Sequence, residues 1–308
     1  MIASVFLALF ASLAYVREPY VGAVAAGAAP GRIVTADGAD NPAYPASVTK
    51  LMTALLVLED VKAGKYALTD RIAATADVYK SEPSWVGLKV GETMTVGDML
   101  TALMVESAND VAIALGVHAS GSLAAFVARM NGRAAELGMK KTVYYNPNGL
   151  PPKGKKYPWK NFNVSTAADQ LRLARELVVK HPEILRYTSV KTCDLVKTAG
   201  GYRVAVTRRV NEPAKTTALA EGEKLVKQMR NHNNVMVKDK LKVFDAAGRE
   251  VVDGLKTGYI DAGGSSVVMT GVKGKKRVIV VVLGSKGSKL RDEHARRLLT
   301  DALDASAW

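Results

Sequence analysis

The sequence predicts an α+β fold in which one antiparallel sheet is built from both ends of the chain, is flanked by helices, and carries an inserted, mainly helical subdomain. Strand-like patterns occupy residues 19–35 near the start and 254–283 near the end. Helical patterns fill most of the chain between them. Strands at both ends of the chain, with helices between them, indicate that the two ends pair in one sheet.

The length and composition of the chain allow one large domain or two moderate ones. Its 308 residues, 48% of them hydrophobic, can bury a substantial core. We expect a single domain over 17–308, in which 17–60 and 235–308 form the α/β part and 61–234 form the helical part.

Each expected element follows from a local pattern. Short β-like segments around a glycine-rich turn predict a hairpin over 19–35. Apolar residues at helical spacing predict helices at 47–63, 96–106, 110–119, 123–137 and 166–180. Weak alternation predicts a second hairpin, formed by 188–196 and 202–210. The strand signal returns at 254–259, 265–272 and 277–283, and a closing helix is expected at 290–303.

The first residues form an apolar run, 2–16, that has the length of a secretory signal peptide. The run is short for a transmembrane helix, and no basic residue precedes it. A misplaced start, an uncleaved anchor and a buried first helix therefore remain alternatives. We expect 1–16 to be a signal peptide or an N-terminal apolar segment, and the protein to be exported to the periplasm or cell envelope. The single Cys193 permits no intrachain disulfide, which does not exclude export.

The chain is strongly basic, with 43 Lys and Arg against 29 Asp and Glu and a net charge of +14. Such charge can face nucleic acid, an anionic membrane or an anionic cell wall. No aromatic interleaving or nucleic-acid motif accompanies it, so we expect no nucleic-acid partner and leave peripheral membrane contact open. The four histidines show no ligand spacing with one another or with Cys193. We therefore expect no metal and no other cofactor.

The stretch around Ser47 and Lys50 carries the first chemical signal. Lys50 is three positions after Ser47, so their side chains lie one turn apart on the same side of a helix that begins here. Pro45 suits a helix entrance, and the free N–H groups of a first turn favour developing negative charge. The pair is a candidate nucleophile and base. The alternative is a helix cap followed by a surface lysine.

Two further short elements stand out. Ser107-Ala108-Asn109 lies in the gap between two expected helices, where a loop can present side chains to a cleft. Lys256-Thr257-Gly258 lies early in an expected strand. Each element alone is weak, but the three occur together in this order and each in its required context. This trio, with Ser-Asp-Asn as the second element, is typical of penicillin-binding proteins and class A β-lactamases.

The chain resembles the D-alanyl-D-alanine carboxypeptidases, the low-molecular-mass penicillin-binding proteins of serine peptidase family S11. The likeness extends beyond the trio and covers most of 19–303, with the resembling segments at 20–25, 45–59, 96–114, 126–150, 165–177, 252–264 and 278–284. It implies a β-lactamase/transpeptidase-like fold. The second element departs from the usual pattern, since it reads Ser-Ala-Asn here. Because the sequence ends soon after the expected closing helix, we expect neither the β-rich C-terminal domain nor the membrane anchor of many members.

The resemblance gives the catalytic residues their roles. Ser47 is the expected nucleophile, and Lys50 serves as its base if burial and nearby positive charge lower its pKa. Lys256 would supply that charge. Ser107 is placed to relay a proton to the departing amine, and Asn109 to bind the substrate backbone or to position Lys50. Ordinary loop capping is the alternative for both residues of this second element.

The expected substrate-binding residues lie near the end of the chain. Lys256 and Thr257 would hold the terminal carboxylate of the substrate, and Gly258 would let the peptide lie against the strand edge. The resemblance implies an oxyanion hole from the backbone N–H groups of Ser47 and Tyr259. Arg291 matches an arginine that helps to recognise the carboxylate, although it could also be a solvated residue at a helix start.

The function implied by the resemblance is that of a serine-type D-Ala-D-Ala carboxypeptidase that acts on peptidoglycan stem peptides and is acylated by β-lactam antibiotics. A DD-endopeptidase acting on cross-links cannot be separated from it by sequence. A class A-like β-lactamase is less favoured, because no glutamate here has asparagine four residues on. A non-catalytic peptidoglycan-binding protein would not need both the nucleophile and its base.

Overall fold

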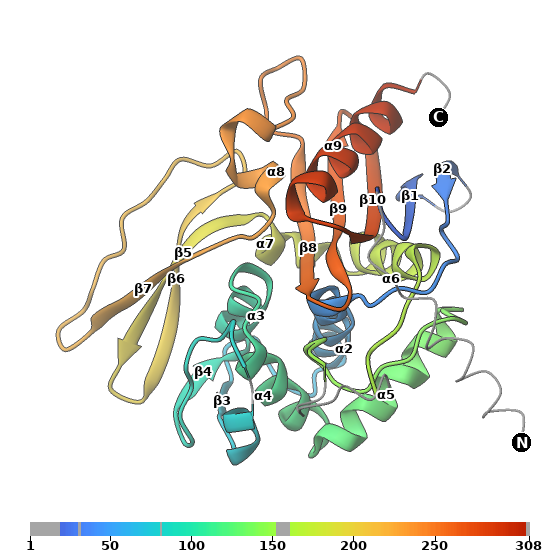
Figure 1. The fold of residues 1–308 in the computed structure, drawn as a ribbon. Coiled ribbons are helices and arrows are strands. Elements are labelled where there is room, and N and C mark those ends of the chain that lie inside the picture. Colours follow the sequence, from blue (N-terminus) through green and yellow to red (C-terminus); the bar gives the residue numbers. More distant parts are fainter. Residues whose placement is uncertain (1–18, 30–31, 81, 152–160, 306–308) are drawn as a thin grey trace, which may run out of the picture.

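The structure is a computed structural model that describes residues 19–29, 32–80, 82–151 and 161–305 (Figure 1). The expected signal peptide or apolar segment, 1–16, lies outside the described residues.

Both ends of the chain meet in one five-stranded antiparallel sheet, in the order β2-β1-β10-β9-β8. Val24 of β1, for example, lies opposite Val281 of β10. The strands are β1 (Gly22–Gly27), β2 (Ile33–Asp37), β8 (Val252–Ile260), β9 (Gly264–Lys273) and β10 (Lys276–Ser285). The predicted α+β fold with a sheet from both termini is therefore confirmed.

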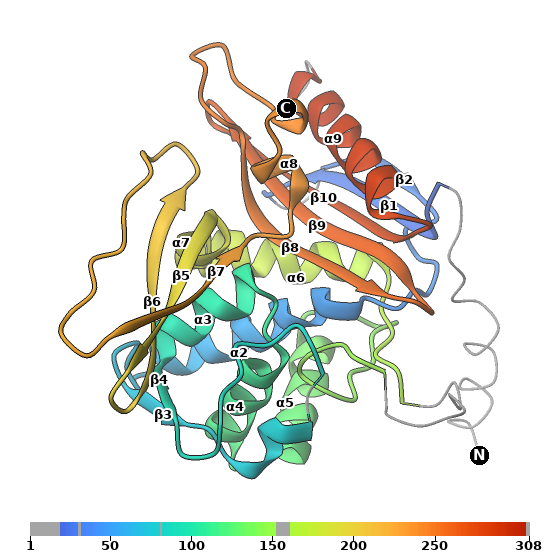
Figure 2. The ribbon, with the colours of Figure 1, turned by 60° about the vertical axis from the view of Figure 1, so that its left-hand side comes forward.

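The strand period of two explains how this sheet is covered. In β10, Val278, Val280 and Val282 point to one core, whereas Ile279, Val281 and Leu283 point to another. The closing helix α9 (Ser288–Asp304) packs on the first face, and α6 (Ala167–Lys180) packs across the second (Figure 2). Because both faces of the sheet are buried at its centre, β1 and most of β10 are almost continuously apolar.

Several helices pack around α2 (Lys50–Lys62), which lies in the middle of the molecule (Figure 1). Ten of its 13 residues are buried, on all sides of the helix, as expected of a core helix. Its neighbours are α3 (Val96–Val105), α4 (Asn109–Ser120) and α5 (Leu123–Glu136). The expected helix over 47–63 begins instead as a short 3₁₀ turn, η1 (Ala46–Thr49), before α2 starts.

A second five-stranded sheet lies in the inserted part, in the order β3-β4-β6-β5-β7. Its strands are β3 (Arg71–Ala73), β4 (Thr93–Thr95), β5 (Val190–Thr198), β6 (Gly201–Arg209) and β7 (Lys224–Arg230). The sequence predicted only the β5–β6 hairpin, because β3 and β4 are three residues long and β7 is mostly exposed. The remaining elements are η2 (Ala76–Lys80), η3 (Pro182–Ile184), α7 (Leu185–Thr188), α8 (Asn234–Val237) and η4 (Asp239–Leu241).

No single helix among the described residues is long and apolar enough to cross a membrane. By length and composition alone, α4 and α5 would match a span together, but they are bent by 86° relative to each other.

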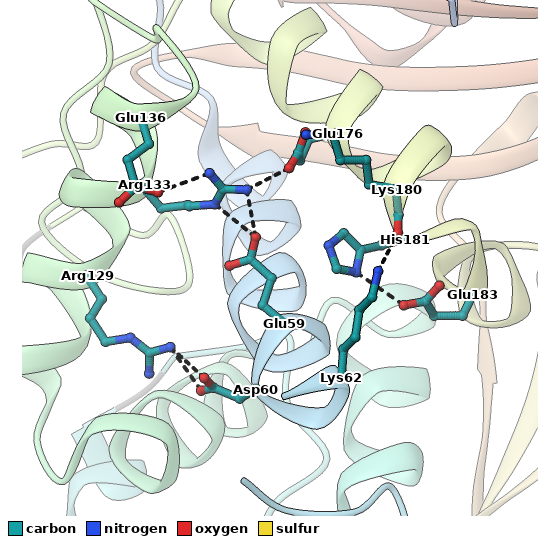
Figure 3. A network of polar contacts seen from close by, with 10 residues as sticks. All are labelled: Glu59, Asp60, Lys62, Arg129, Arg133, Glu136, Glu176, Lys180, His181 and Glu183. Carbon is teal, nitrogen blue, oxygen red and sulfur yellow. Dashed lines mark hydrogen bonds and ion pairs between the residues drawn. The ribbon is translucent and has the colours of Figure 1, made fainter. Parts of the chain in front are cut away.

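A polar network holds the end of α2 between α5 and α6 (Figure 3). Arg133 of α5 lies at its centre, with Nη2 2.8 Å from a Glu59 carboxylate oxygen on α2 and 2.6 Å from one of Glu176 on α6. Beside it, Arg129 donates to both carboxylate oxygens of Asp60, at 2.9 and 3.0 Å. The network ties three helices together at the end of α2 that lies opposite Lys50.

Replacing Arg133 with Met should destabilise the fold, because it leaves the Glu176 carboxylate, 9% exposed, and its Glu59 neighbour without their shared cation. We expect the free energy of unfolding in urea to fall by about 2 kcal/mol. The control is Arg249→Met, which removes a side chain that is 65% exposed and pairs with Asp245 within one turn. Its effect should stay below about 0.5 kcal/mol. Equal effects of the two substitutions would show that the network does not brace α2.

Candidate active site

The turn that carries Ser47 is held by close backbone contacts on two sides. A β-carbon on Gly258 of β8 would lie 2.6 Å from the Pro45 carbonyl oxygen and 3.0 Å from the Ser47 nitrogen. A β-carbon on Gly149, whose φ is +85°, would lie 1.9 Å from the carbonyl oxygen of Ala46. Both positions therefore need glycine. Ser47 itself remains partly exposed at the start of the helix.

Lys50 is fully buried and has three polar neighbours around its amine. Nζ lies 2.9 Å from Ser47 Oγ, 2.7 Å from Asn109 Oδ1 and 2.8 Å from the Asn148 carbonyl oxygen. Asn109 Nδ2 donates to the carbonyl oxygen of Glu82 at 2.7 Å, which fixes the amide so that its oxygen faces Lys50. Two of the three neighbours, the Asn109 and Asn148 oxygens, can thus only accept hydrogen bonds. The third, the Ser47 hydroxyl, can also donate one.

Burial holds the pKa of Lys50 well below its usual range, and the positive charge of Lys256 acts in the same direction. The Asp110 carboxylate opposes this shift. A neutral amine has two N–H groups and one lone pair. With the N–H groups directed to Asn109 and Asn148, the lone pair faces the Ser47 hydroxyl. The arrangement can take a proton from Ser47.

A second group of cations lies close to this pair. Burial, together with the positive charge of Arg291, lowers the pKa of Lys256 to about 7. Lys256 Nζ donates to the Thr257 carbonyl oxygen at 2.9 Å. Arg291 is only 4% exposed and donates from Nε and Nη2 to Asp292 Oδ1, at 2.9 and 2.6 Å. It is therefore not a solvated arginine at a helix start. The cluster carries more positive than negative charge and suits a carboxylate.

The remaining predicted residues lie on the walls of the site. Thr257 is buried, whereas the Tyr259 side chain is 60% exposed and its hydroxyl donates to Asp261 at 2.7 Å. Ser107 lies in the α3–α4 connection with a φ of +63°. Among the described residues, its side chain makes no hydrogen bond to Ser47 or Lys50. The structure thus joins Ser47, Lys50 and Asn109 directly and brings Lys256 and Arg291 beside them.

A family model for D-alanyl-D-alanine carboxypeptidases, peptidase S11, matches residues 21–287. The chain belongs to this family.

Curated relatives of this chain include D-alanyl-D-alanine carboxypeptidase DacC of Escherichia coli, which is 29% identical over 96% of the chain and 66% of the relative. Another is DacF of Bacillus subtilis, 29% identical over 87% of the chain and 58% of the relative. The chain therefore spans somewhat less than two thirds of the length of these relatives.

Solved structures of this family share the fold. The D-alanyl-D-alanine carboxypeptidase DacD of Francisella tularensis has a TM-score of 0.76 and 27% identity, and the match covers 92% of this chain and 70% of that one. Penicillin-binding protein D2 of Listeria monocytogenes, in its ampicillin-bound form, has a TM-score of 0.68 and 27% identity over 93% and 98% of the two chains. These matches agree with the predicted fold and family.

Two asparagines of this S11 chain support the site but were not predicted as functional. Asn148 contributes only a main-chain carbonyl, which has no side-chain signature in sequence. Asn163 Nδ2 donates to Thr49 Oγ1 and to the Asn146 carbonyl oxygen, both at 3.0 Å, and so ties the loop of Asn148 to the nucleophile turn. The turn-rich composition of 146–152 was the available signal, but it indicated a loop and no more.

One group of side chains has the composition of a metal site. The ligand atoms of Glu59, Glu176 and His181 lie within 4.8 Å of one another. Arg133 already joins the two carboxylates (Figure 3), and His181 Nδ1 lies 3.2 Å from Glu183. The group is better explained as part of the structural ion-pair network than as a metal centre.

Substituting Gly258 with Ala should displace the Ser47 turn, because the new methyl group would collide with backbone atoms of Pro45 and Ser47. We expect the rate of acylation by a fluorescent penicillin to fall on the order of 10²-fold. Gly200→Ala is the matched control, since a β-carbon there meets nothing within 4 Å. A normal acylation rate in folded Gly258→Ala protein would show that the close approach of β8 does not position Ser47.

Proposed function

We propose that the chain is a serine-type D-Ala-D-Ala carboxypeptidase that removes the terminal D-alanine of peptidoglycan stem peptides through an acyl-enzyme on Ser47. The observation that carries this proposal is the buried Lys50 amine, 2.9 Å from Ser47 Oγ and with its pKa well below the usual range. A serine hydroxyl needs such a base to attack a carbonyl near neutral pH. A protein that only bound peptidoglycan would not need a buried lysine whose charged form is destabilised.

Acylation follows from the geometry. Lys50 takes the Ser47 proton as Oγ attacks the carbonyl carbon between the two D-alanines, and the N–H groups of Ser47 and Tyr259 stabilise the oxyanion. The close fit of Gly258 against Ser47 supports this assignment, because it places the backbone of β8 against the turn. Ser107 relays a proton to the departing amine. Water then hydrolyses the ester and restores the Ser47 hydroxyl.

Substrate recognition rests on the cation cluster. Lys256, Thr257 and Arg291 hold the terminal carboxylate. The buried positive charges of this cluster are only partly neutralised by acidic neighbours, so they favour a bound anion. For Asn109 the contacts favour positioning Lys50 over binding the substrate backbone, because its amide oxygen and nitrogen are both already occupied. Family membership also supports β-lactams as covalent inhibitors, as in the ampicillin-bound relative.

A peptidoglycan substrate implies that the protein acts outside the cytoplasmic membrane. We therefore retain export to the periplasm or cell envelope as part of the proposal. Peripheral membrane contact through basic surface remains a prediction from the net charge of +14. A class A β-lactamase is the weaker enzyme candidate, because the S11 family model covers 21–287 and no Glu-x-x-x-Asn pattern occurs.

Ser47→Ala should abolish both penicillin labelling and release of D-alanine from a pentapeptide, because no nucleophile remains. Folding should be unchanged by circular dichroism, since Ser47 lies partly exposed at the turn. Ser288→Ala, which alters an exposed serine at the start of α9, should label and hydrolyse normally. Release of D-alanine by the Ser47→Ala protein at the normal rate would place the nucleophile elsewhere.

The acylation rate should decrease above a pH of about 7 with a carboxylate-bearing β-lactam, because the pKa of Lys256 is lowered to about 7 and its charge is then lost. The measured quantity is the second-order acylation rate constant as a function of pH. In Lys256→Arg the cation persists to much higher pH, so the decrease should move out of this range even if the absolute rate is lower. The same midpoint in both proteins would exclude Lys256 as the titrating group.

A further inference from the structure

Asp110, the second residue of α4, is a buried carboxylate that the reaction described so far does not use. Its Oδ2 accepts the backbone N–H groups of Gly87 and Leu88, at 2.9 and 3.0 Å. Its Oδ1 accepts from Val86 at 3.2 Å and from the following residue of α4 at 2.9 Å. A carboxylate has about four acceptor positions, so main-chain donors use nearly all of them. The carboxylate therefore fastens 86–88 to the start of α4.

This arrangement differs from an ordinary helix cap. An acidic residue in the first turn of a helix commonly binds the free N–H groups of its own helix. Three of the four donors to Asp110 belong instead to consecutive residues of a loop, 22 to 24 positions earlier in the chain. Gly87 in this loop has a φ of +88°, a conformation that can turn successive N–H groups toward one anion. The loop is thus shaped around the carboxylate.

The same loop also binds the residue that orients the base. The Asn109 backbone N–H donates to the Ser84 carbonyl oxygen at 2.8 Å, and Asn109 Nδ2 donates to the Glu82 carbonyl oxygen at 2.7 Å. With its nitrogen held in this way, the amide places Oδ1 2.7 Å from Lys50 Nζ. Two adjacent residues of α4 therefore bind the two ends of one segment, 82–88. If Asp110 released its end, the Glu82 carbonyl would no longer be fixed and the amide could turn away from Lys50.

We propose that Asp110 is a positioning residue for acylation: it fastens the 82–88 segment so that the Asn109 amide faces Lys50, and it holds a negative charge near that amine. Asp110 acts through these two residues and not on the substrate, because its bonds go to main-chain N–H groups. The inference rests on the proposed function, since it concerns the same acyl-enzyme on Ser47.

The charge of Asp110 provides a readout that a purely structural residue would not affect. The charged and titratable groups that face Lys50 are Lys256 from β8, His232 from the segment before α8, and Asp110 itself. Among these three, only the Asp110 carboxylate favours the protonated amine and so raises the pKa of Lys50. Acylation should rise with pH as Lys50 loses its proton. Removal of the negative charge lowers this pKa, so the midpoint of the rise should move to lower pH.

The test measures the second-order rate constant for acylation by a fluorescent penicillin as a function of pH, in variants that fold by circular dichroism. Asp110→Glu keeps the charge but displaces the carboxylate by one methylene, whereas Asp110→Asn keeps the shape and removes the charge. We expect both to lower the rate by about tenfold. The midpoint of the rise should lie lower in Asp110→Asn than in Asp110→Glu, by about half a pH unit or more.

Gly87→Ala tests the segment without altering α4. The substitution disfavours the φ of +88°, while the new methyl group would meet nothing within 4 Å. The rate should again fall by about tenfold, with no fall in the midpoint, because the Asp110 charge is retained. This variant also carries the test if Asp110→Glu does not fold. In Asn109→Ala protein, Asp110→Glu should lower the rate by less than a further twofold or so, because both residues act through one amide.

Asp169→Asn is the matched control. Asp169 is a buried carboxylate in the first turn of α6 that likewise binds a distant backbone N–H group, that of Lys141, at 2.9 Å. Its substitution should leave the rate within about twofold and the midpoint unchanged.

Three results would overturn the role of Asp110: normal acylation by folded Asp110→Glu and Gly87→Ala, equal midpoints in Asp110→Glu and Asp110→Asn, or a full further loss in the Asn109→Ala background. In each case normal labelling of the natural protein would leave the proposed function intact. Failure of the natural protein to label would instead refute the proposed function, and this inference with it.

Discussion

The constraint on which the site depends is the burial of the Lys50 amine. Removing an ammonium group from water is costly, so the group either finds a carboxylate or gives up its proton. Its contacts here are a hydroxyl, an amide oxygen and a main-chain oxygen, and a second lysine lies nearby. The surroundings therefore favour the neutral amine. Lys50 begins the central helix α2, and the ion-pair network holds the other end of that helix in place. The amine therefore stays buried.

The two lysines couple substrate binding to the readiness of the base. Lys256, with a pKa of about 7, carries only part of its charge in the free protein at neutral pH. A substrate carboxylate bound beside it would raise this pKa and complete the charge. The full charge on Lys256 would in turn hold the pKa of Lys50 lower. The bound carboxylate also acts directly on Lys50 and opposes this effect, so the protonation of the base depends on what is bound beside Lys256.

The sequence was sufficient for the parts of the molecule that have strong local patterns. The terminal sheet could be predicted because its short β-like segments are bounded by turn residues, and α3 to α6 because their apolar spacing is regular. Strands β3, β4 and β7 could not, because they are short or exposed and exist only through pairing with partners distant in sequence. The Asn148 carbonyl was missed for a related reason, since any residue has one. The burial of Arg291 depends on the tertiary position of α9.

Strand β7, which the sequence did not predict, lies beside the connection that carries Ser107. The strand β8 is the free edge of the first sheet and β7 is the free edge of the second, so each sheet contributes an edge to the region of the site. Lys227 of β7 joins this edge to the Trp85 carbonyl oxygen and to Glu106, next to Ser107. Farther along β7, Gln228 and Arg230 line an open pocket together with Glu106. Lys227 therefore helps to fix Glu106, and with it the backbone that leads into Ser107, from a strand that carries none of Ser47, Lys50 and Lys256.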